Sequence, residues 1–216
     1  MADPAPLLRD THVRKLFCTP VLAEMWPDAP RHNAALRAAI AQQAASADSV
    51  AKSNIHGWQS DVTMAEWGGP AAAALLAHAV ARADAHTART ADAPRDWVPE
   101  MWANASQRGA SNQTHAHPGS VWSAVYYVDD GYAGSPDKAL AGELSFLDPR
   151  FPAVRMAAPE LRHRRPDGTI DNQEVWLRPR TGLFVMFPSW LLHSVRPYGG
   201  QGTRISIAIN LVAGRG

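Results

Sequence analysis

Three histidines in this 216-residue sequence stand at spacings that could bind a metal ion. His115 and His117 are two residues apart, so in an extended segment both side chains lie on one face, with Cα atoms roughly 6.5–7 Å apart. Two imidazoles placed in this way can reach one ion at about 2.1 Å. The same pattern also fits two exposed polar residues near the end of a strand. His193 follows an apolar strand and could either complete a metal site or be buried in the core.

An arginine and a serine follow in a strand whose two faces differ. Over residues 204–210, alternation places Arg204, Ser206 and Ala208 on one face and three isoleucines on the other. The isoleucines are expected in the core between layers. Opposite them, an arginine facing a barrel lumen would be a buried charge without compensation. A carboxylate ligand would compensate it through charge-assisted hydrogen bonds; the alternative is an arginine at an open barrel mouth, paired with an aspartate.

The elements expected to position these residues change in character near Pro94. Before it, apolar periodicity predicts helices over residues 33–47 and 70–89, the second beginning at a proline. After it, short β-branched and aromatic runs predict at least six strands without intervening helices. These strands cover residues 97–105, 121–128, 142–147, 174–177, 182–187 and 204–212. Such a series predicts a sandwich, jelly roll or barrel. The irregular stretch 149–172 predicts a long surface loop that could act as a lid.

Composition excludes several other classes of protein. With 46% hydrophobic and 19% charged residues, we expect a single domain, helical over residues 1–93 and a β core over 94–216. Lys and Arg total 21 against 20 Asp and Glu, which argues against binding to nucleic acid or a membrane surface. No run of about 18 uninterrupted apolar residues is present. The single cysteine, Cys18, and the absence of a secretory leader at the first residues predict a cytoplasmic protein.

Taken in order, these motifs resemble the 2-oxoglutarate/Fe(II) oxygenase superfamily, and more narrowly its small bacterial and phage branch related to prolyl hydroxylases. The resemblance extends from Leu16 to Asn210 and depends on the order of the motifs rather than on any single one. The segments that carry it are His-Ala-His, a strand ending Tyr-Tyr-Val, Gly-Glu-Leu-Ser-Phe-Leu-Asp-Pro-Arg, Phe-Pro-Ser-Trp-Leu-Leu-His and Arg-Ile-Ser.

The resemblance implies a double-stranded β-helix (jelly roll) that uses Fe(II), O2 and 2-oxoglutarate as co-substrate. His115 and His193 match metal ligands of the superfamily. Arg204 matches the residue that holds the far carboxylate of 2-oxoglutarate, Ser206 the hydroxyl beside it, and Tyr127 a tyrosine that reaches the same carboxylate. The implied activity is hydroxylation of an unactivated C–H bond in a small molecule or in an amino-acid or peptide side chain, with 2-oxoglutarate converted to succinate.

His117 departs from the usual superfamily motif, which has two histidines and one carboxylate. Three neutral imidazoles leave the metal site one negative charge short, which favours anionic co-ligands. A distant acid such as Asp61 or Glu143, or a water molecule, is an alternative third ligand. Halogenases of this superfamily leave the position empty for a halide, so a histidine there argues against halogenation.

Two other functions also fit the motifs. A cupin-type dioxygenase with three histidine ligands would bind its substrate directly to iron and would not use 2-oxoglutarate, which leaves Arg204 and Ser206 without a role unless they hold a substrate carboxylate. A non-catalytic jelly-roll module could instead hold zinc in the histidine cluster. Closed tetrahedral zinc needs a fourth protein ligand, and the sequence offers no obvious cysteine for it.

Overall fold

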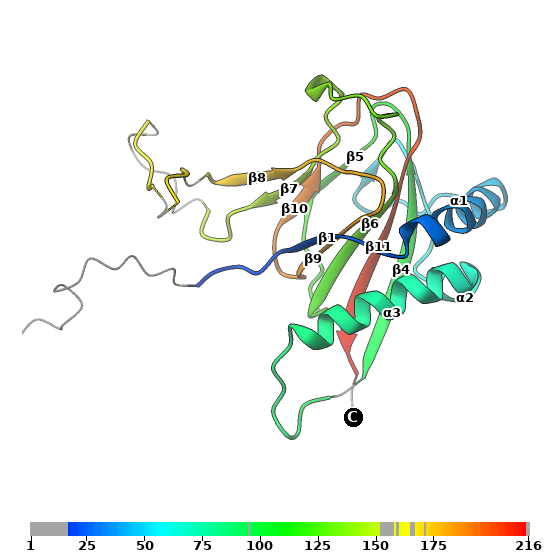
Figure 1. Ribbon diagram of the computed structural model, residues 1–216, viewed down its shortest axis with the longest axis horizontal. Helices are drawn as coiled ribbons and strands as arrows, with labels where there is room; N and C mark the ends of the chain where they lie inside the picture. Colours follow the sequence, from blue (N-terminus) through cyan, green and yellow to red (C-terminus); the bar gives the residue numbers. More distant parts are fainter. Residues whose placement is uncertain are drawn as a thin grey trace, which may run out of the picture.

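The computed structural model describes residues 17–94, 96–151, 158, 160–164, 167–170 and 172–214, and its core is a pair of antiparallel sheets (Figure 1). The larger sheet has the order β1 (Leu22–Met25), β9 (Leu183–Pro188), β6 (Trp122–Asp129), β11 (Arg204–Ala213), β4 (Trp97–Ser106), β3 (Trp58–Gln59). The smaller sheet has the order β2 (Asn54–Ile55), β5 (Ser111–His115), β10 (His193–Val195), β7 (Leu144–Leu147), β8 (Glu174–Leu177). Successive strands cross between the sheets, as β9 and β10 do, which is the pattern of a jelly roll.

Two long helices cover the outer face of the larger sheet. They are α1 (Ala29–Ser46) and α3 (Gly69–Ala85), which the short helix α2 (Met64–Trp67) precedes. Both long helices begin with a proline in the first turn, where its missing N–H costs no hydrogen bond. Leu36, Ile40 and Leu75 are fully buried against the sheet. Both predicted helices are therefore confirmed, with ends shifted by a few residues. No helix within the described ranges is long and apolar enough to cross a membrane.

The alternation predicted for β11 is confirmed. Ile205, Ile207 and Ile209 are at most 8% exposed and pack into the core beneath the helices. Arg204 and Ser206 point to the opposite face, into a pocket between the two sheets. All six predicted strands are present, because their β-branched and aromatic residues pack on both faces of a sheet.

Five further strands were not predicted from the sequence. Three of them, β1, β2 and β3, lie in the part expected to be helical, and the other two are β5 and β10. All five are short, with two to five residues, and none of them is a run of β-branched or aromatic residues. Pairing with longer neighbours creates them: β1 pairs with β9 and β3 with β4.

The remaining segments are loops. The 3-10 helix η2 (Lys138–Leu140) follows β6, and the described parts of the stretch 149–172 contain one isolated bridge, between Arg164 and Ile170. The other residues of that stretch lie outside the described residues, as do residues 1–16, including Leu16, where the resemblance begins.

Candidate functional site

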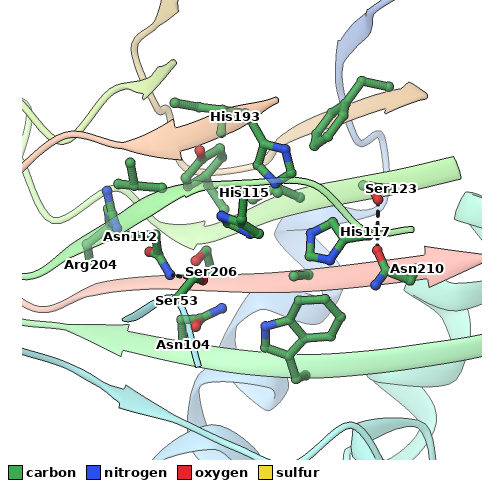
Figure 2. Close-up of a pocket in the computed structure, with 18 residues that line it drawn as sticks. Ser53, Asn104, Asn112, His115, His117, Ser123, His193, Arg204, Ser206 and Asn210 are labelled. Atoms are coloured by element: carbon green, nitrogen blue, oxygen red, sulfur yellow. Dashed lines mark hydrogen bonds between the residues drawn. The ribbon is translucent and has the colours of Figure 1, made fainter. Parts of the chain in front are cut away.

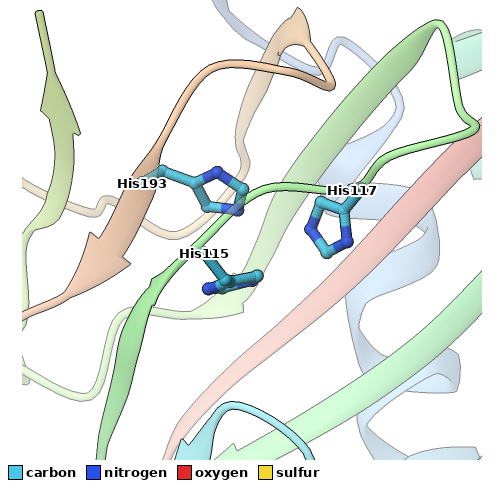
Figure 3. Close-up of side chains that lie close together, drawn as sticks. All are labelled: His115, His117 and His193. Carbon is cyan, nitrogen blue, oxygen red and sulfur yellow. The ribbon is translucent and has the colours of Figure 1, made fainter. Parts of the chain in front are cut away.

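The smaller sheet brings the three predicted histidines together. His115 ends β5 and lies directly opposite His193, the first residue of β10. The turn after β5 places His117 beside them, where its backbone N–H donates to the Ser189 carbonyl at 2.9 Å. One possible ligand atom from each of the three residues lies within 4.8 Å of the others, close enough to share one metal ion (Figure 3). No other such group of His, Cys, Asp and Glu is found among the described residues.

Hydrogen bonds orient two of the three rings toward a common point. Nδ1 of His115 lies 2.7 Å from the Gln113 carbonyl oxygen, and Nδ1 of His193 lies 2.8 Å from the Leu191 carbonyl oxygen. A carbonyl only accepts, so each Nδ1 carries the proton and each Nε2 keeps a free lone pair. Histidine ligands of metals are held in the same way. The His117 ring has no such bond within the described part of the chain; it packs against Trp102 with ring centroids 5.6 Å apart.

Burial keeps two of these histidines neutral. It lowers the pKa of His193 to about 3, against the opposing effect of the Leu191 carbonyl. Burial likewise lowers the pKa of His117 to about 4, and the nearby charges of His115 and Lys52 act in the same direction. At neutral pH both rings therefore hold a lone pair that could bind a cation.

One end of the pocket holds a buried cation without a counter-ion. Arg204 is 2% exposed; its Nη1 donates to the Gly142 carbonyl at 2.7 Å, and its Nη2 lies 3.4 Å from the Ser106 hydroxyl. Its Nε has no partner among the described residues. An arginine at an open barrel mouth would be paired with an aspartate, and no aspartate among the described residues pairs with Arg204.

A second unpartnered donor lies at the same end. The Tyr127 hydroxyl is buried and has no hydrogen-bond partner in the described part of the chain; burial raises its pKa to about 12, so it is protonated at neutral pH. Tyr127 is paired across the strands with Ser206, which lies two residues from Arg204 (Figure 2). Unpartnered buried donors are uncommon, since each costs about 1–3 kcal/mol. A carboxylate could accept hydrogen bonds from both donors, Nε of Arg204 and the Tyr127 hydroxyl. A guanidinium cation is also a common partner of a carboxylate.

The opposite end of the pocket is also polar, which the sequence did not predict. The Ser123 hydroxyl donates to Oδ1 of Asn210 at 2.8 Å, and Nδ2 of Asn210 lies 3.4 Å from a Glu100 carboxylate oxygen. Ser123 and Asn210 lie near His117 in Figure 2, and Trp102 lines the same end. Ser106, beside Arg204, was missed as well. All of these contacts depend on the register between strands, for which the sequence gives no signal.

No aspartate or glutamate lines the pocket within the described ranges. Glu143 accepts from Nη1 of Arg196 at 3.0 Å, outside the pocket lining. Asp61 accepts from the backbone N–H and the hydroxyl of Thr63. The two acids considered as alternative ligands are therefore occupied elsewhere. Asn104 and Asn112 do line the pocket, where Nδ2 of Asn112 donates to the Ser53 hydroxyl at 3.2 Å.

A jelly roll whose lumen holds a cluster of side chains that could bind a metal ion is the architecture of non-haem metal oxygenases. Comparison with known proteins gives the family. Residues 100–210 match the model of the family described as "Putative 2OG-Fe(II) oxygenase". The chain therefore belongs to the 2OG-Fe(II) oxygenase family and is a 2-oxoglutarate-dependent oxygenase. The family uses Fe(II) and 2-oxoglutarate.

Solved structures confirm the jelly-roll fold. A prolyl-4-hydroxylase from Pseudomonas putida is 18% identical, with a TM-score of 0.63 over 92% of this chain and 94% of its own. A prolyl hydroxylase from Trichoplax adhaerens, solved with a peptide of hypoxia inducible factor, is 13% identical, with a TM-score of 0.63 over 89% and 83%. HygX from Streptomyces hygroscopicus, solved with nickel, 2-oxoglutarate and hygromycin B, is 14% identical, with a TM-score of 0.59 over 91% and 86%. No curated protein matches this sequence.

Proposed function

We propose that this oxygenase hydroxylates an unactivated C–H bond of a small molecule or of an amino-acid or peptide side chain. In this proposal His115, His117 and His193 hold Fe(II), and the distal carboxylate of 2-oxoglutarate binds at the Arg204 end of the pocket. The observation that carries the proposal is the pair of buried donors without partners, Nε of Arg204 and the hydroxyl of Tyr127, in the pocket that the histidines line.

The donor set suits both groups. Three neutral imidazoles suit Fe(II), and they leave positions for further ligands. Arg204 would pair with the co-substrate carboxylate, with Tyr127 and Ser206 donating hydrogen bonds to it. When bound, iron and 2-oxoglutarate supply the oxidising chemistry: O2 places one oxygen atom in succinate, CO2 is released, and the other atom enters the substrate C–H bond. The protein's own task is to orient these groups and exclude water.

The other end of the pocket is the proposed position of the substrate. Trp102, Ser123 and Asn210 line this end, next to His117 and away from Arg204. Asn210 keeps one amide N–H and one oxygen lone pair free for a ligand after its bonds to Ser123 and Glu100. The substrate class draws support from relatives of the same fold, one solved with a peptide and one with hygromycin B.

One observation favours a second candidate, the cupin-type dioxygenase that does not use 2-oxoglutarate. The described pocket lining has three histidines and no carboxylate, as that reading expects. Such an enzyme would need a substrate carboxylate at Arg204 to compensate the buried charge. Zinc in a non-catalytic module lacks support, because no fourth ligand joins the cluster within the described residues.

Isotope labelling tests the proposed reaction. Iron-loaded protein receives 2-oxoglutarate and ¹⁸O2 together with pools of amino acids, peptides or small polar molecules, and the products are analysed by mass spectrometry. We expect one pool to accelerate succinate formation and to yield a product that carries one ¹⁸O atom for each succinate. A consumed substrate without ¹⁸O, as in desaturation or epimerisation, would contradict hydroxylation. Incorporation of ¹⁸O into a substrate when 2-oxoglutarate is left out would favour the second candidate.

A further inference from the structure

The side chains that line the pocket carry a net positive charge. Among the described residues that line it, Arg204 is the only one with a permanent charge, and no carboxylate faces the pocket. Arg204 donates to a carbonyl and to a hydroxyl, both of them neutral groups. The protein alone therefore holds one buried positive charge without a counter-charge, which is costly in a low dielectric.

A divalent metal increases this imbalance. Imidazoles that coordinate a metal are neutral, so His115, His117 and His193 would add ligand atoms but no negative charge. With two positive charges on the metal and one on Arg204, the pocket would hold three positive charges. A site with an ordinary carboxylate ligand would hold one fewer. Glu100, whose carboxylate lies 3.4 Å from Nδ2 of the lining residue Asn210, is exposed to water, which screens its charge.

The co-substrate is the anion that restores the balance. 2-Oxoglutarate carries two negative charges, one carboxylate for the metal end of the pocket and one for the Arg204 end. It reduces the net charge of the pocket from three to one. Electrostatic interactions are stronger in this buried pocket than in water, so the reduction has a large effect on the free energy of binding. We propose that metal and 2-oxoglutarate bind this pocket as a strongly coupled pair, and that the uncharged residue at position 117 makes this coupling stronger than an aspartate there would. This inference rests on the proposed function.

Coupling of this kind is reciprocal, so the metal raises the affinity for 2-oxoglutarate by the same factor by which 2-oxoglutarate raises the affinity for the metal. A chelating co-substrate gives some coupling in any metal site, whatever its ligands. The structure-specific part is the charge at position 117, and a comparison of variants isolates it. We expect substitution there to leave the fold intact, because the segment is held through the His117 backbone N–H to Ser189 and the side chain makes no hydrogen bond within the described chain.

The experiment measures the Kd of Ni(II), a redox-inert probe, by competition with a fluorescent chelator, with and without saturating 2-oxoglutarate. The coupling factor is the ratio of the two Kd values. It is determined for the wild type, for His117→Asp and for His117→Asn, which has the shape of the aspartate without its charge. We expect the wild-type factor to exceed that of His117→Asp by about tenfold or more. The His117→Asn factor should lie near the wild-type one; thermal melts check that each variant is folded.

The outcomes separate the two proposals. Equal coupling factors in the wild type and His117→Asp, or a larger factor in His117→Asp, would overturn the inference about charge. If 2-oxoglutarate left the Ni(II) affinity of the wild type unchanged and did not bind the Ni(II)-loaded protein, the proposed function would fall with it. A factor that drops equally in His117→Asp and His117→Asn would show that loss of the imidazole, and not the added charge, is responsible, and would also overturn the inference.

Discussion

Arg204 and Tyr127 hold buried polar atoms that have no hydrogen-bond partner among the described residues. Each such atom lowers the stability of the protein, because water is lost and nothing replaces it. Both atoms lie at the same end of one pocket, so a single anionic group could satisfy them together. At the scale of single residues, the site thus has the features of a binding site that is complete only when its ligand is present.

Tyr127→Phe should affect stability and binding in opposite directions. Removal of the unpartnered hydroxyl should raise the free energy of unfolding of the ligand-free protein by up to about 1 kcal/mol. The same change should weaken 2-oxoglutarate binding by roughly tenfold, measured by calorimetry on Ni(II)-loaded protein. Tyr126→Phe is the matched control: its hydroxyl bonds Asn33 on the helix side, so this variant should lose about 1 kcal/mol and bind normally. A destabilised Tyr127→Phe with normal binding would contradict the assignment.

Only some of the residues that line the pocket were predicted from the sequence. Arg204 and Ser206 follow from alternation along one strand, and His115 and His117 from a spacing of two, because such patterns are local. The same alternation places Ser123 and Asn210 on the pocket faces of their strands, but the contact between them, and that of Ser106 with Arg204, could not be predicted. These contacts depend on which residue of one strand faces which residue of the next, and that register is fixed by packing of the whole sheet.

At the scale of elements, the two faces of β11 have different roles: one contributes to stability and the other to the proposed binding site. One face packs under α1 and α3, and the other lines the pocket. Ile207→Ala should therefore lower the free energy of unfolding by about 2–4 kcal/mol, because Ile207 is fully buried in the core. Ser206→Ala should change stability little and weaken 2-oxoglutarate binding several-fold. Urea unfolding and calorimetry on both variants check this, and loss of stability in Ser206→Ala alone would contradict the assignment of faces.

The elements that could be predicted from the sequence are those with a recognisable apolar pattern. Helices α1 and α3 and the six predicted strands contain apolar, β-branched or aromatic residues in a recognisable pattern. The strands β5 and β10, which carry His115 and His193, have a polar sequence or only three residues. Their strand conformation comes from pairing with each other and with β7, so only the folded sheet reveals it.

At the scale of the whole molecule, folding brings together groups that are far apart in sequence. The strand β1 links the N-terminal part to the β core. Its residue Glu24 accepts a hydrogen bond from Nε of Arg82 at 2.6 Å and lies 2.9 Å from Nε2 of His78, and both partners are on α3. The helices thereby brace the larger sheet from outside. His193 is buried and His117 is half-buried between the sheets, which makes their protonation part of the folding equilibrium.

This burial predicts acid sensitivity of the metal-free protein. The pKa values of His193 and His117 are lowered from 6.5 to about 3 and about 4, so below pH 6.5 the unfolded chain binds protons that the folded pocket does not. Stability should therefore fall as the pH drops from 6.5, by up to about 1.4 kcal/mol per pH unit for each histidine. Carboxylates with lowered pKa values, such as Asp148, affect stability mainly below about pH 5.

Urea unfolding across this pH window measures the effect. His117→Gln should show a shallower decline than the wild type, because one of the two responsible groups is gone. His32→Gln, on the far side of the larger sheet beside Trp26, is the control and should decline like the wild type. Stability that stays constant from pH 6.5 down to about pH 5 would disagree with buried neutral histidines.

The central claim is that Arg204 binds the co-substrate of an iron oxygenase. The most direct test is succinate formation from 2-oxoglutarate by iron-loaded protein exposed to O2, without added substrate, in the wild type and in Arg204→Met. We expect iron-dependent succinate from the wild type and, at limiting 2-oxoglutarate, at least about 30-fold less from Arg204→Met, with Ni(II) affinity retained. The exposed Arg180→Met should behave as the wild type. Equal succinate formation by Arg204→Met and the wild type would contradict the claim.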